Sequence, residues 1–370
     1  METVLSGWQK KFPEMGIYVM LPEAEKENVS VIQDVCRSLK IPVVGGIFPQ
    51  LINSGIFTSE GAWFLFFEKM PFYSIKENFP VDSFDLDGIT EDITDEITRE
   101  IEDIPDITLL MLFDGMIPNI STFLDMLYMK LANRVNYVGA NAGSETFQPM
   151  PCIFDGERTV HNGVLFLLIN HHQGAILEHG YKTPDDPVYA TAASGNCISQ
   201  IDWRPAFEVY QELVKNKYGI EINKENFYEY SVHFPFGILR ANHHVLVRIP
   251  VLLNEEGGLV CVGEVAPNSM LTLLEAPAVN SEETLTMLIN GLNSLNGKSS
   301  DKNLLVFYCA GRRMHMGIDA SSRELKRFSE MSGAENTSGA LSLGEIGGST
   351  VHGYPLFHNA TIVATGWKSG

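Results

Sequence analysis

Hydrophobic and polar positions along the chain follow the same order three times. Each time, an apolar run typical of a buried strand precedes an amphipathic helix pattern, a second strand rich in glycine and a further apolar strand. The runs that open the three copies are residues 17–21, 107–113 and 304–308. This pattern predicts three copies of one strand-helix-strand-strand unit.

Each copy also has the spacing that gives a helix one apolar face. The positions that mark this face are Ile32, Val35, Cys36 and Leu39 in the first copy, Ile120, Phe123, Leu124, Leu127 and Leu131 in the second, and Leu325 and Phe328 in the third. Asn119 is placed to cap the second helix, and Ser321 with Glu324 has capping-box spacing in the third. We therefore expect one helix to cover each unit.

Glycines recur where the second strand of each copy ends. They are Gly45 and Gly46, then Gly139 and Gly143, then Gly344, Gly347 and Gly348. A residue without a Cβ lets the backbone approach a ligand or another strand closely. We interpret these glycines as equivalent strand-end positions beside a shared cleft; the alternative is that they only shape tight turns.

Two other segments have a clear pattern. Residues 205–213 predict a helix, and residues 245–253 with 259–265 predict a hairpin turning at Asn254 that extends the sheet. The acidic stretch 82–106 carries Ile89, Ile93, Ile97, Ile101 and Ile104 at helical spacing. It predicts an amphipathic helix that packs its isoleucines on its own domain, with a partner-docking surface as the alternative.

Composition and charge narrow the class of protein. The chain has 370 residues, 45% of them hydrophobic, and a formal net charge of -20. This charge would repel nucleic-acid phosphates, so a nucleic-acid partner is not expected. No apolar run approaches the roughly 18 to 20 residues of a membrane span, and the N-terminus lacks a signal-peptide pattern. We expect a cytoplasmic protein without membrane insertion.

The five cysteines, Cys36, Cys152, Cys197, Cys261 and Cys309, are odd in number and lack CxxC spacing, so we expect reduced thiols. Common signatures of hydrolases, nucleotide-binding loops and metalloproteases are missing. Cys309 has Arg312 and Arg313 close by, which would lower the pKa of its thiol. Alternatively, Cys309 is a buried packing residue.

Arg312 and Glu345 are candidates for holding an amino acid by its carboxylate and its ammonium group. The alternative is that the two side chains pair with each other or with the backbone. Of the ten histidines, the adjacent pairs His171–His172 and His243–His244 cannot readily share a metal. His233 lies among large apolar residues, where it could be an axial haem ligand or a hydrogen-bonded core histidine.

The third copy contains a set of motifs that resembles a known family. Cys309-Ala-Gly-Arg, Gly344-Glu-Ile-Gly-Gly and Tyr354-Pro-Leu-Phe-His-Asn-Ala-Thr are similar to the C-terminal half of the FIST sensory family. Further similar motifs are Asp202-Trp-Arg-Pro-Ala-Phe, Gly45-Gly-Ile-Phe-Pro-Gln and Gly143-Ser-Glu-Thr-Phe-Gln-Pro. The resemblance covers nearly the whole chain.

The resemblance implies a sensor of a small-molecule ligand that acts through a signalling partner, such as a histidine kinase or a cyclic-di-GMP enzyme. Since the chain has no room for an output domain of its own, we expect contact with a separate partner. Some stand-alone family members bind haem and sense nitric oxide, so haem b, held by His233, is the cofactor that the resemblance suggests. The competing class is an enzyme with Cys309 as nucleophile and His358 as base.

The sequence therefore predicts an α/β fold of two packed halves, residues 1–195 and 196–370, built from the repeated units with extended mixed sheets. We predict ligand contacts in the third copy, from Cys309, Arg312, Gly344, Glu345, His358 and Asn359.

Overall fold

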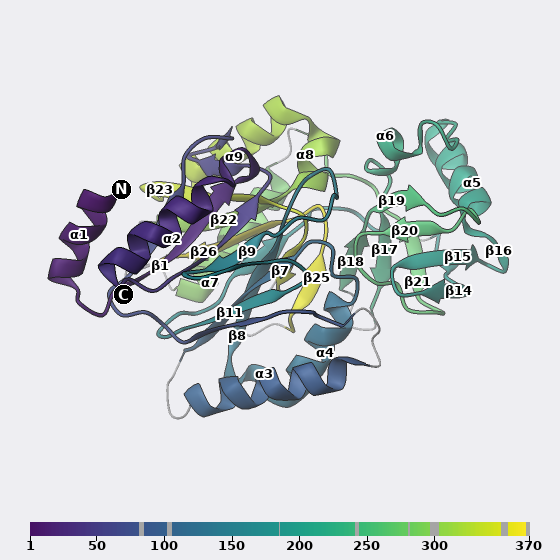
Figure 1. The fold of residues 1–370 in the computed structure, drawn as a ribbon. Helices are drawn as coiled ribbons and strands as arrows, with labels where there is room; N and C mark the ends of the chain where they lie inside the picture. Colours follow the sequence, from purple (N-terminus) through teal and green to yellow (C-terminus); the bar gives the residue numbers. More distant parts are fainter. Residues whose placement is uncertain are drawn as a thin grey trace.

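The structure is a computed structural model that describes residues 1–80, 85–101, 106–184, 186–240, 244–279, 282–296, 303–348 and 354–367. It has an α/β fold in which helices cover mixed sheets (Figure 1). None of the helices in these ranges combines the length and apolar character that crossing a membrane requires.

The three predicted units are present. In each, two parallel strands flank a helical segment and a third strand lies antiparallel to the first. The first unit consists of β1 (Gly16–Pro22), α2 (Asn28–Leu39), β2 (Val43–Phe48) and β5 (Trp63–Phe67). The second consists of β7 (Thr108–Asp114), α4 (Ile120–Leu131), β8 (Asn136–Ala142) and β11 (Val164–Ile169). The third consists of β22 (Asn303–Cys309), α8 (Ala310–Met316), α9 (Ile318–Ser332), β23 (Asn336–Ser342) and β26 (Ile362–Gly366).

Short strands exchange between the units in a cycle. The strand that follows β2 pairs with β23, the strand that follows β8 pairs with β2, and the strand that follows β23 pairs with β8. These strands are β3 (Leu51–Asn53), β9 (Ile153–Asp155) and β24 (Glu345–Gly347), and each forms a hairpin with β4 (Ile56–Thr58), β10 (Thr159–Val160) or β25 (Leu356–His358). Each unit is thus completed by its neighbours.

A second exchange links the outer edges of the sheets. The strand β6 (Tyr73–Lys76), after the first unit, pairs with β11, and β12 (Ile176–Glu178), after the second, pairs with β26. Within the described ranges, the result is three sheets of five, six and six strands.

The glycine equivalence predicted from the sequence is confirmed for Gly45 and Gly139 but wrong for the third copy, where Gly344, Gly347 and Gly348 were expected. Strand register instead makes Gly45, Gly139 and Gly339 equivalent, opposite Val19, Met111 and Val306. A Cβ on any of them would lie within 2.5 Å of the carbonyl oxygen of the opposite residue. These glycines therefore lie inside strands, where they permit close backbone approach.

One core lies between the three sheets. Because side chains alternate along a strand, Leu110 and Leu112 of β7 and Leu305 and Phe307 of β22 face this core. Phe48 stacks on Phe307 with ring centroids 5.9 Å apart, which joins the first and third units.

Helices cover the opposite faces of the sheets. The acidic helix α3 (Leu86–Glu100) packs with α4 over the second sheet and buries Ile93 and Ile97, which confirms the prediction that it packs on its own domain; Ile104 lies outside the described residues. The helix α7 (Glu283–Asn296) lies on β12 and β26, and α1 (Glu2–Lys11) lies beside α2. Short 3-10 turns occupy Glu23–Glu25 and Ala132–Arg134.

Most of the chain between β12 and α7 forms a small lobe, at the right in Figure 1. Its described residues form two sheets. The first contains, in spatial order, β13 (Val188–Tyr189), β21 (Met270–Leu273), β17 (Phe236–Leu239) and β18 (Val245–Arg248). The second contains β14 (Ala192–Ser194), β15 (Cys197–Ile201), β20 (Leu259–Cys261) and β19 (Pro250–Leu253), and β16 (Arg204–Pro205) also pairs with β15. Two helices, α5 (Ala206–Tyr218) and α6 (Phe227–Ser231), complete the lobe.

The lobe corrects one expectation. The predicted hairpin exists as β19 and β20, but the segment 245–253 is divided at Ile249, so that β18 and β19 belong to different sheets. The two sheets of the lobe therefore do not extend the sheets of the three units. We call the three units, with the helices that cover them, the body. The division of the chain into halves at residue 195 stays a prediction.

Candidate functional site

A pocket lies where the small lobe meets the body, beyond the carboxyl end of β22. The ends of the second strands of the three units, with the residues that follow them, meet near this end; we call these the crossover segments. Gly143 N donates to Ile47 O at 2.8 Å, and Leu341 N donates to Gln50 O at 2.9 Å. In α/β proteins, ligands commonly bind in the crevice outside the carboxyl ends of the strands, where the connections leave the sheet in different directions.

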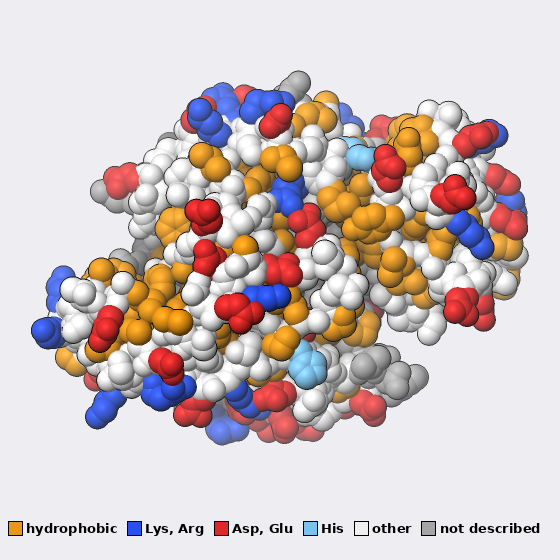
Figure 2. Space-filling model, turned by 45° about the horizontal axis from the view of Figure 1, so that its top comes forward, with side chains coloured by type: hydrophobic (Ala, Val, Ile, Leu, Met, Phe, Trp, Pro, Cys, Tyr) orange, Lys and Arg blue, Asp and Glu red, His pale blue; other side chains and the backbone are white. Residues whose placement is uncertain are grey.

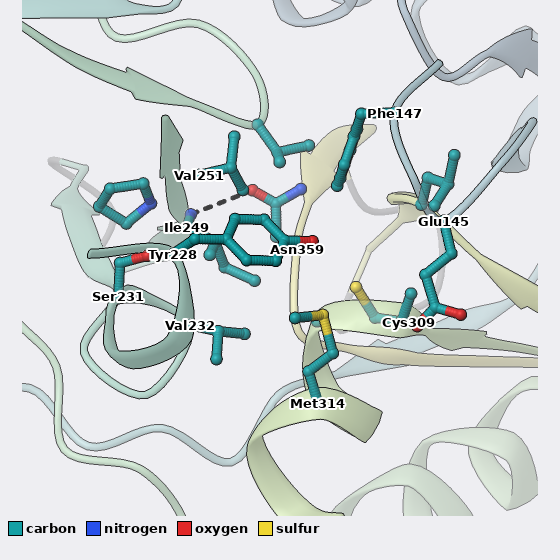
Figure 3. Close-up of a pocket in the computed structure, with 15 residues that line it drawn as sticks. Glu145, Phe147, Tyr228, Ser231, Val232, Ile249, Val251, Cys309, Met314 and Asn359 are labelled. Carbon is teal, nitrogen blue, oxygen red and sulfur yellow. Dashed lines mark hydrogen bonds between the residues drawn. The ribbon is translucent and has the colours of Figure 1, made fainter. Parts of the chain in front are cut away.

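Both parts of the molecule contribute side chains to this junction pocket. Its lining from the lobe is Tyr228, Ser231, Val232, Ile249, Pro250, Val251 and Val262, and from the body Glu145, Phe147, Cys309, Ala310, Gly311, Met314, Leu343 and Asn359. Figure 3 shows Tyr228 and Ser231 on one side and Cys309 and Glu145 on the other. Figure 2 shows hydrophobic side chains gathered where the lobe meets the body.

The pocket is narrow. The space between its side chains is about 450 Å³ when counted out to open solvent, but only about 30 Å³ can hold the centre of a water molecule. Since one water needs about 10–15 Å³ by this measure, a larger ligand requires the walls to separate.

Few polar groups face this mainly apolar space. The hydroxyl of Ser231 is buried and has no hydrogen-bond partner among the described residues. Asn359 Oδ1 accepts from Ile249 N at 3.4 Å, the contact drawn in Figure 3. A buried hydroxyl without a partner is costly, so Ser231 is a natural contact for a polar group of a ligand.

Glu145 is held in place by Arg313. Arg313 Nη2 donates to Glu145 Oε2 at 2.6 Å, and Nη1 donates to Gln50. The guanidinium also lies over the ring of Phe57 at 5.1 Å. Arg313 thereby ties α8 to the crossover segments of the first and second units.

Arg312 does not line the junction pocket. Its Nε and Nη2 donate to the two oxygens of Glu324 at 2.9 and 2.6 Å, and Nη1 donates to the carbonyls of His179 and Ala360. Burial alone would lower the pKa of Arg312, but the Glu324 carboxylate raises it above its usual range. Arg312 is thus paired within the protein, though with Glu324 rather than with Glu345.

Glu345 is fully buried and does not line the pocket. Ser342 Oγ and Thr361 Oγ1 each donate to it at 2.5 Å. Burial raises the pKa of Glu345 to about 7. The arrangement that would hold an amino acid between Arg312 and Glu345 is absent from this conformation.

Cys309 faces the pocket, but its acidity is opposite to the expectation from sequence. Burial, and then the charge of Glu345, raises the pKa of its thiol above the usual range. The nearby arginines do not activate it because Arg312 and Arg313 are committed to carboxylates. All five cysteines are free thiols.

The remaining predicted residues lie next to the pocket. A Cβ on Gly344 would lie 2.5 Å from the ring of Phe357, so this glycine permits ring packing. His358 is buried, and its Nδ1 has no hydrogen-bond partner among the described residues. Burial, with the charge of His179 next, lowers its pKa well below the usual value.

His233 follows the pocket residue Val232 but contacts another histidine. Its Nδ1 lies 3.0 Å from Nδ1 of His315 on α8, so the pair bridges the lobe and the body. Burial lowers the pKa of both, to about 4 for His315.

The described residues do not fit haem in this conformation. Neither the junction pocket nor the larger cleft described below has a histidine in its lining, and His233 is already engaged. Within the described ranges, no three His, Cys, Asp or Glu side chains converge where they could hold a metal ion. Haem binding stays a prediction of the family resemblance.

Sequence reasoning missed most of the lining of the junction pocket. Tyr228 lies far from the third unit in sequence, and no local pattern distinguishes it from a core aromatic. Phe147 lies in the motif Gly143-Ser-Glu-Thr-Phe-Gln-Pro, but no ligand contact was assigned to that motif. Ser231 had a weak signal, as a hydroxyl within a large apolar segment. Only Cys309 and Asn359 of the predicted ligand contacts line the pocket.

Two family models match the chain. The FIST N domain matches residues 17–204, and the FIST C domain matches residues 206–348. No curated protein matches the chain at a significant level.

Proposed function

Because the chain belongs to the FIST family, whose domains are sensory domains of signal-transduction proteins, we propose that it senses a small molecule bound in the junction pocket. The observation that carries this proposal is that the lobe and the body line the same pocket. A ligand there contacts both parts, so its affinity depends on how they pack, and binding favours one packing over another.

The lining favours a mainly apolar ligand with one polar group. Val232, Ile249 and Met314 supply apolar contacts, while the Ser231 hydroxyl can hydrogen-bond a polar end. Because the pocket admits only about two or three waters as it stands, ligand binding must move Tyr228 or α8 outward.

In this proposal, the protein transmits its signal by contact with a separate partner protein. A histidine kinase or a cyclic-di-GMP enzyme is the partner class that the family resemblance suggests. The short helix α8 is suited to transmit the change, since it lines the pocket through Met314, contacts the lobe through His315 and is tied to the body through Arg313.

A thermal-shift screen tests the proposal. Small apolar carboxylic acids, amines, alcohols and apolar amino acids would be screened, because a ligand that binds only the folded state raises Tm. Hits would be measured by calorimetry with Tyr228→Ala and with the control Tyr189→Ala, whose side chain is on the same lobe, similarly exposed (48% against 46%) and absent from the pocket.

We expect Tyr228→Ala and Ser231→Ala to weaken binding by about tenfold each, equivalent to about 1.4 kcal/mol, and Tyr189→Ala to leave it unchanged. Ligand binding that neither pocket variant alters would sink the assignment of this pocket.

A further inference from the structure

A second and larger cleft lies between the lobe and the start of α4. Its volume is about 870 Å³, within the usual range for small-molecule sites. The charged side chains in its described lining are Asp125 of α4, Arg240 directly after β17, Arg248 of β18 and Glu264 of the segment between β20 and β21. No residue in the described part of the chain lines both this cleft and the junction pocket.

Three of the four charged groups in this cleft are satisfied by the protein. Arg248 is fully buried and donates to the carbonyls of Glu264, Phe357 and Val247 and to Ser121 Oγ. Glu264 accepts from Thr122 N at 2.9 Å and from its hydroxyl at 2.5 Å. Asp125 accepts from Tyr354 Oη at 2.8 Å.

Arg240 is the exception. It is half-buried at the end of β17, and its backbone N donates to His244 O at 2.9 Å. Its guanidinium makes no hydrogen bond or ion pair with any residue in the described ranges. A charged donor partly removed from water without an acceptor is unfavourable, so a ligand that supplies an acceptor gains free energy there.

We propose that this cleft binds a small molecule bearing a carboxylate or phosphate group, held by forked hydrogen bonds from Arg240. A guanidinium matches the planar edge of a carboxylate, or two phosphate oxygens, with two parallel N–H donors. The site is separate from the pocket of the proposed function and does not depend on it.

The charges of the cleft permit an anion. The carboxylate of Glu264 already occupies the N-terminus of α4, where it accepts from Thr122, so the positive charge left for a ligand is that of Arg240. Arg240 and Arg248 together balance Asp125 and Glu264, so the cleft does not share the strong negative charge of the whole chain, which is -20.

Calorimetry with inorganic phosphate, pyrophosphate and citrate in a low-salt amine buffer tests this inference. The variants are Arg240→Gln and Arg240→Lys, with Arg204→Gln as the matched control, because Arg204 lies on the same lobe and pairs with Glu212 on the surface. Arg240→Gln and Arg204→Gln change the net charge equally, so a difference between them reports the site and not the overall field.

We expect one-to-one binding of at least one probe, about tenfold weaker in Arg240→Gln and unchanged in Arg204→Gln. Preference for pyrophosphate would identify a phosphate ligand, and preference for citrate a carboxylate. Arg240→Lys keeps the charge but loses the fork, so it should bind more weakly than wild type even if Arg240→Gln fails to fold. Absence of saturable binding to all three probes, or an equal loss in both Gln variants, would overturn the proposal.

Discussion

Arg312 and Glu324 form a two-point ion pair inside the protein, with side chains only 1% and 5% exposed. The pair joins α8, which follows β22, to α9, and Tyr308 Oη donates to the same carboxylate at 2.7 Å. It fixes the helix that carries the pocket residue Met314.

Replacing one partner of this pair should destabilise the protein strongly. Glu324→Gln leaves a buried guanidinium without a countercharge, so we expect the free energy of unfolding to fall by about 3–5 kcal/mol in urea denaturation. The control is Glu212→Gln, which breaks an exposed pair with Arg204 and should leave the urea midpoint unchanged. Equal effects of the two changes would contradict the structural role of Arg312.

Gly339 should not tolerate a side chain. A Cβ there would lie 1.7 Å from Val306 O, and the backbone of a central strand cannot move aside. We expect Gly339→Ala to cost about 3 kcal/mol, the upper end for overpacking. By contrast, Gly88→Ala in α3 meets no atom within 4 Å and should stabilise the helix by about 0.5–1 kcal/mol. Thermal unfolding is the test: we expect the Tm to fall in Gly339→Ala and to rise in Gly88→Ala.

Glu345 should make stability fall as pH rises through neutrality. Its folded pKa, about 7, is above the unfolded value of about 4.3, so the folded state binds more protons between these pH values. The contribution of Glu345 is therefore fully present below pH 4.3 and is lost as pH rises to 7, by about 3 kcal/mol. Unfolding free energies of wild type and Glu345→Gln across pH 4–8 measure it as a difference. A pH-independent difference would show that Glu345 does not titrate in this range.

His179 should have the opposite effect at lower pH. Burial first, and then the charge of Arg312, lowers its folded pKa to about 4, below the unfolded value of about 6.5. Its contribution is present above pH 6.5 and is lost as pH falls to 4, by about 3 kcal/mol. We expect His179→Gln to reduce acid sensitivity in urea titrations, while His161→Gln, at an exposed position, leaves it unchanged. A steeper acid transition in His179→Gln would refute this reading.

The described histidines do not offer haem an axial ligand. Because His233 contacts His315 and none of the histidines in the described ranges lines either cavity, we expect added haemin to give no stoichiometric Soret band. The absorption spectrum would be recorded for wild type and His233→Ala. A one-to-one band that the substitution abolishes would contradict this expectation and support a haem-binding sensor.

Much of the fold could be predicted because its signals are local. The spacing of Ile32, Cys36 and Leu39 gave a helix face, and the isoleucines near Ile93 gave the buried stripe of α3. Both follow from the 3.6-residue period of the helix, which needs no knowledge of distant segments. The asparagine turn at Asn254 likewise depends on neighbours, since Asn254 N and Oδ1 bond within the turn.

The tertiary structure alone decided how the units combine and what the site contains. The exchange of β3, β9 and β24 joins segments that are far apart in sequence, and pairing across such distances has no local pattern. For the same reason, the sequence showed that Arg312 is close to Cys309 along the chain but could not show that Arg312 forms its ion pair with Glu324. Nor could it show that burial raises the pKa of the Cys309 thiol. Periodicity determined the elements of this protein, whereas contacts between distant residues, and the water they exclude, determined which side chains remain available to a ligand.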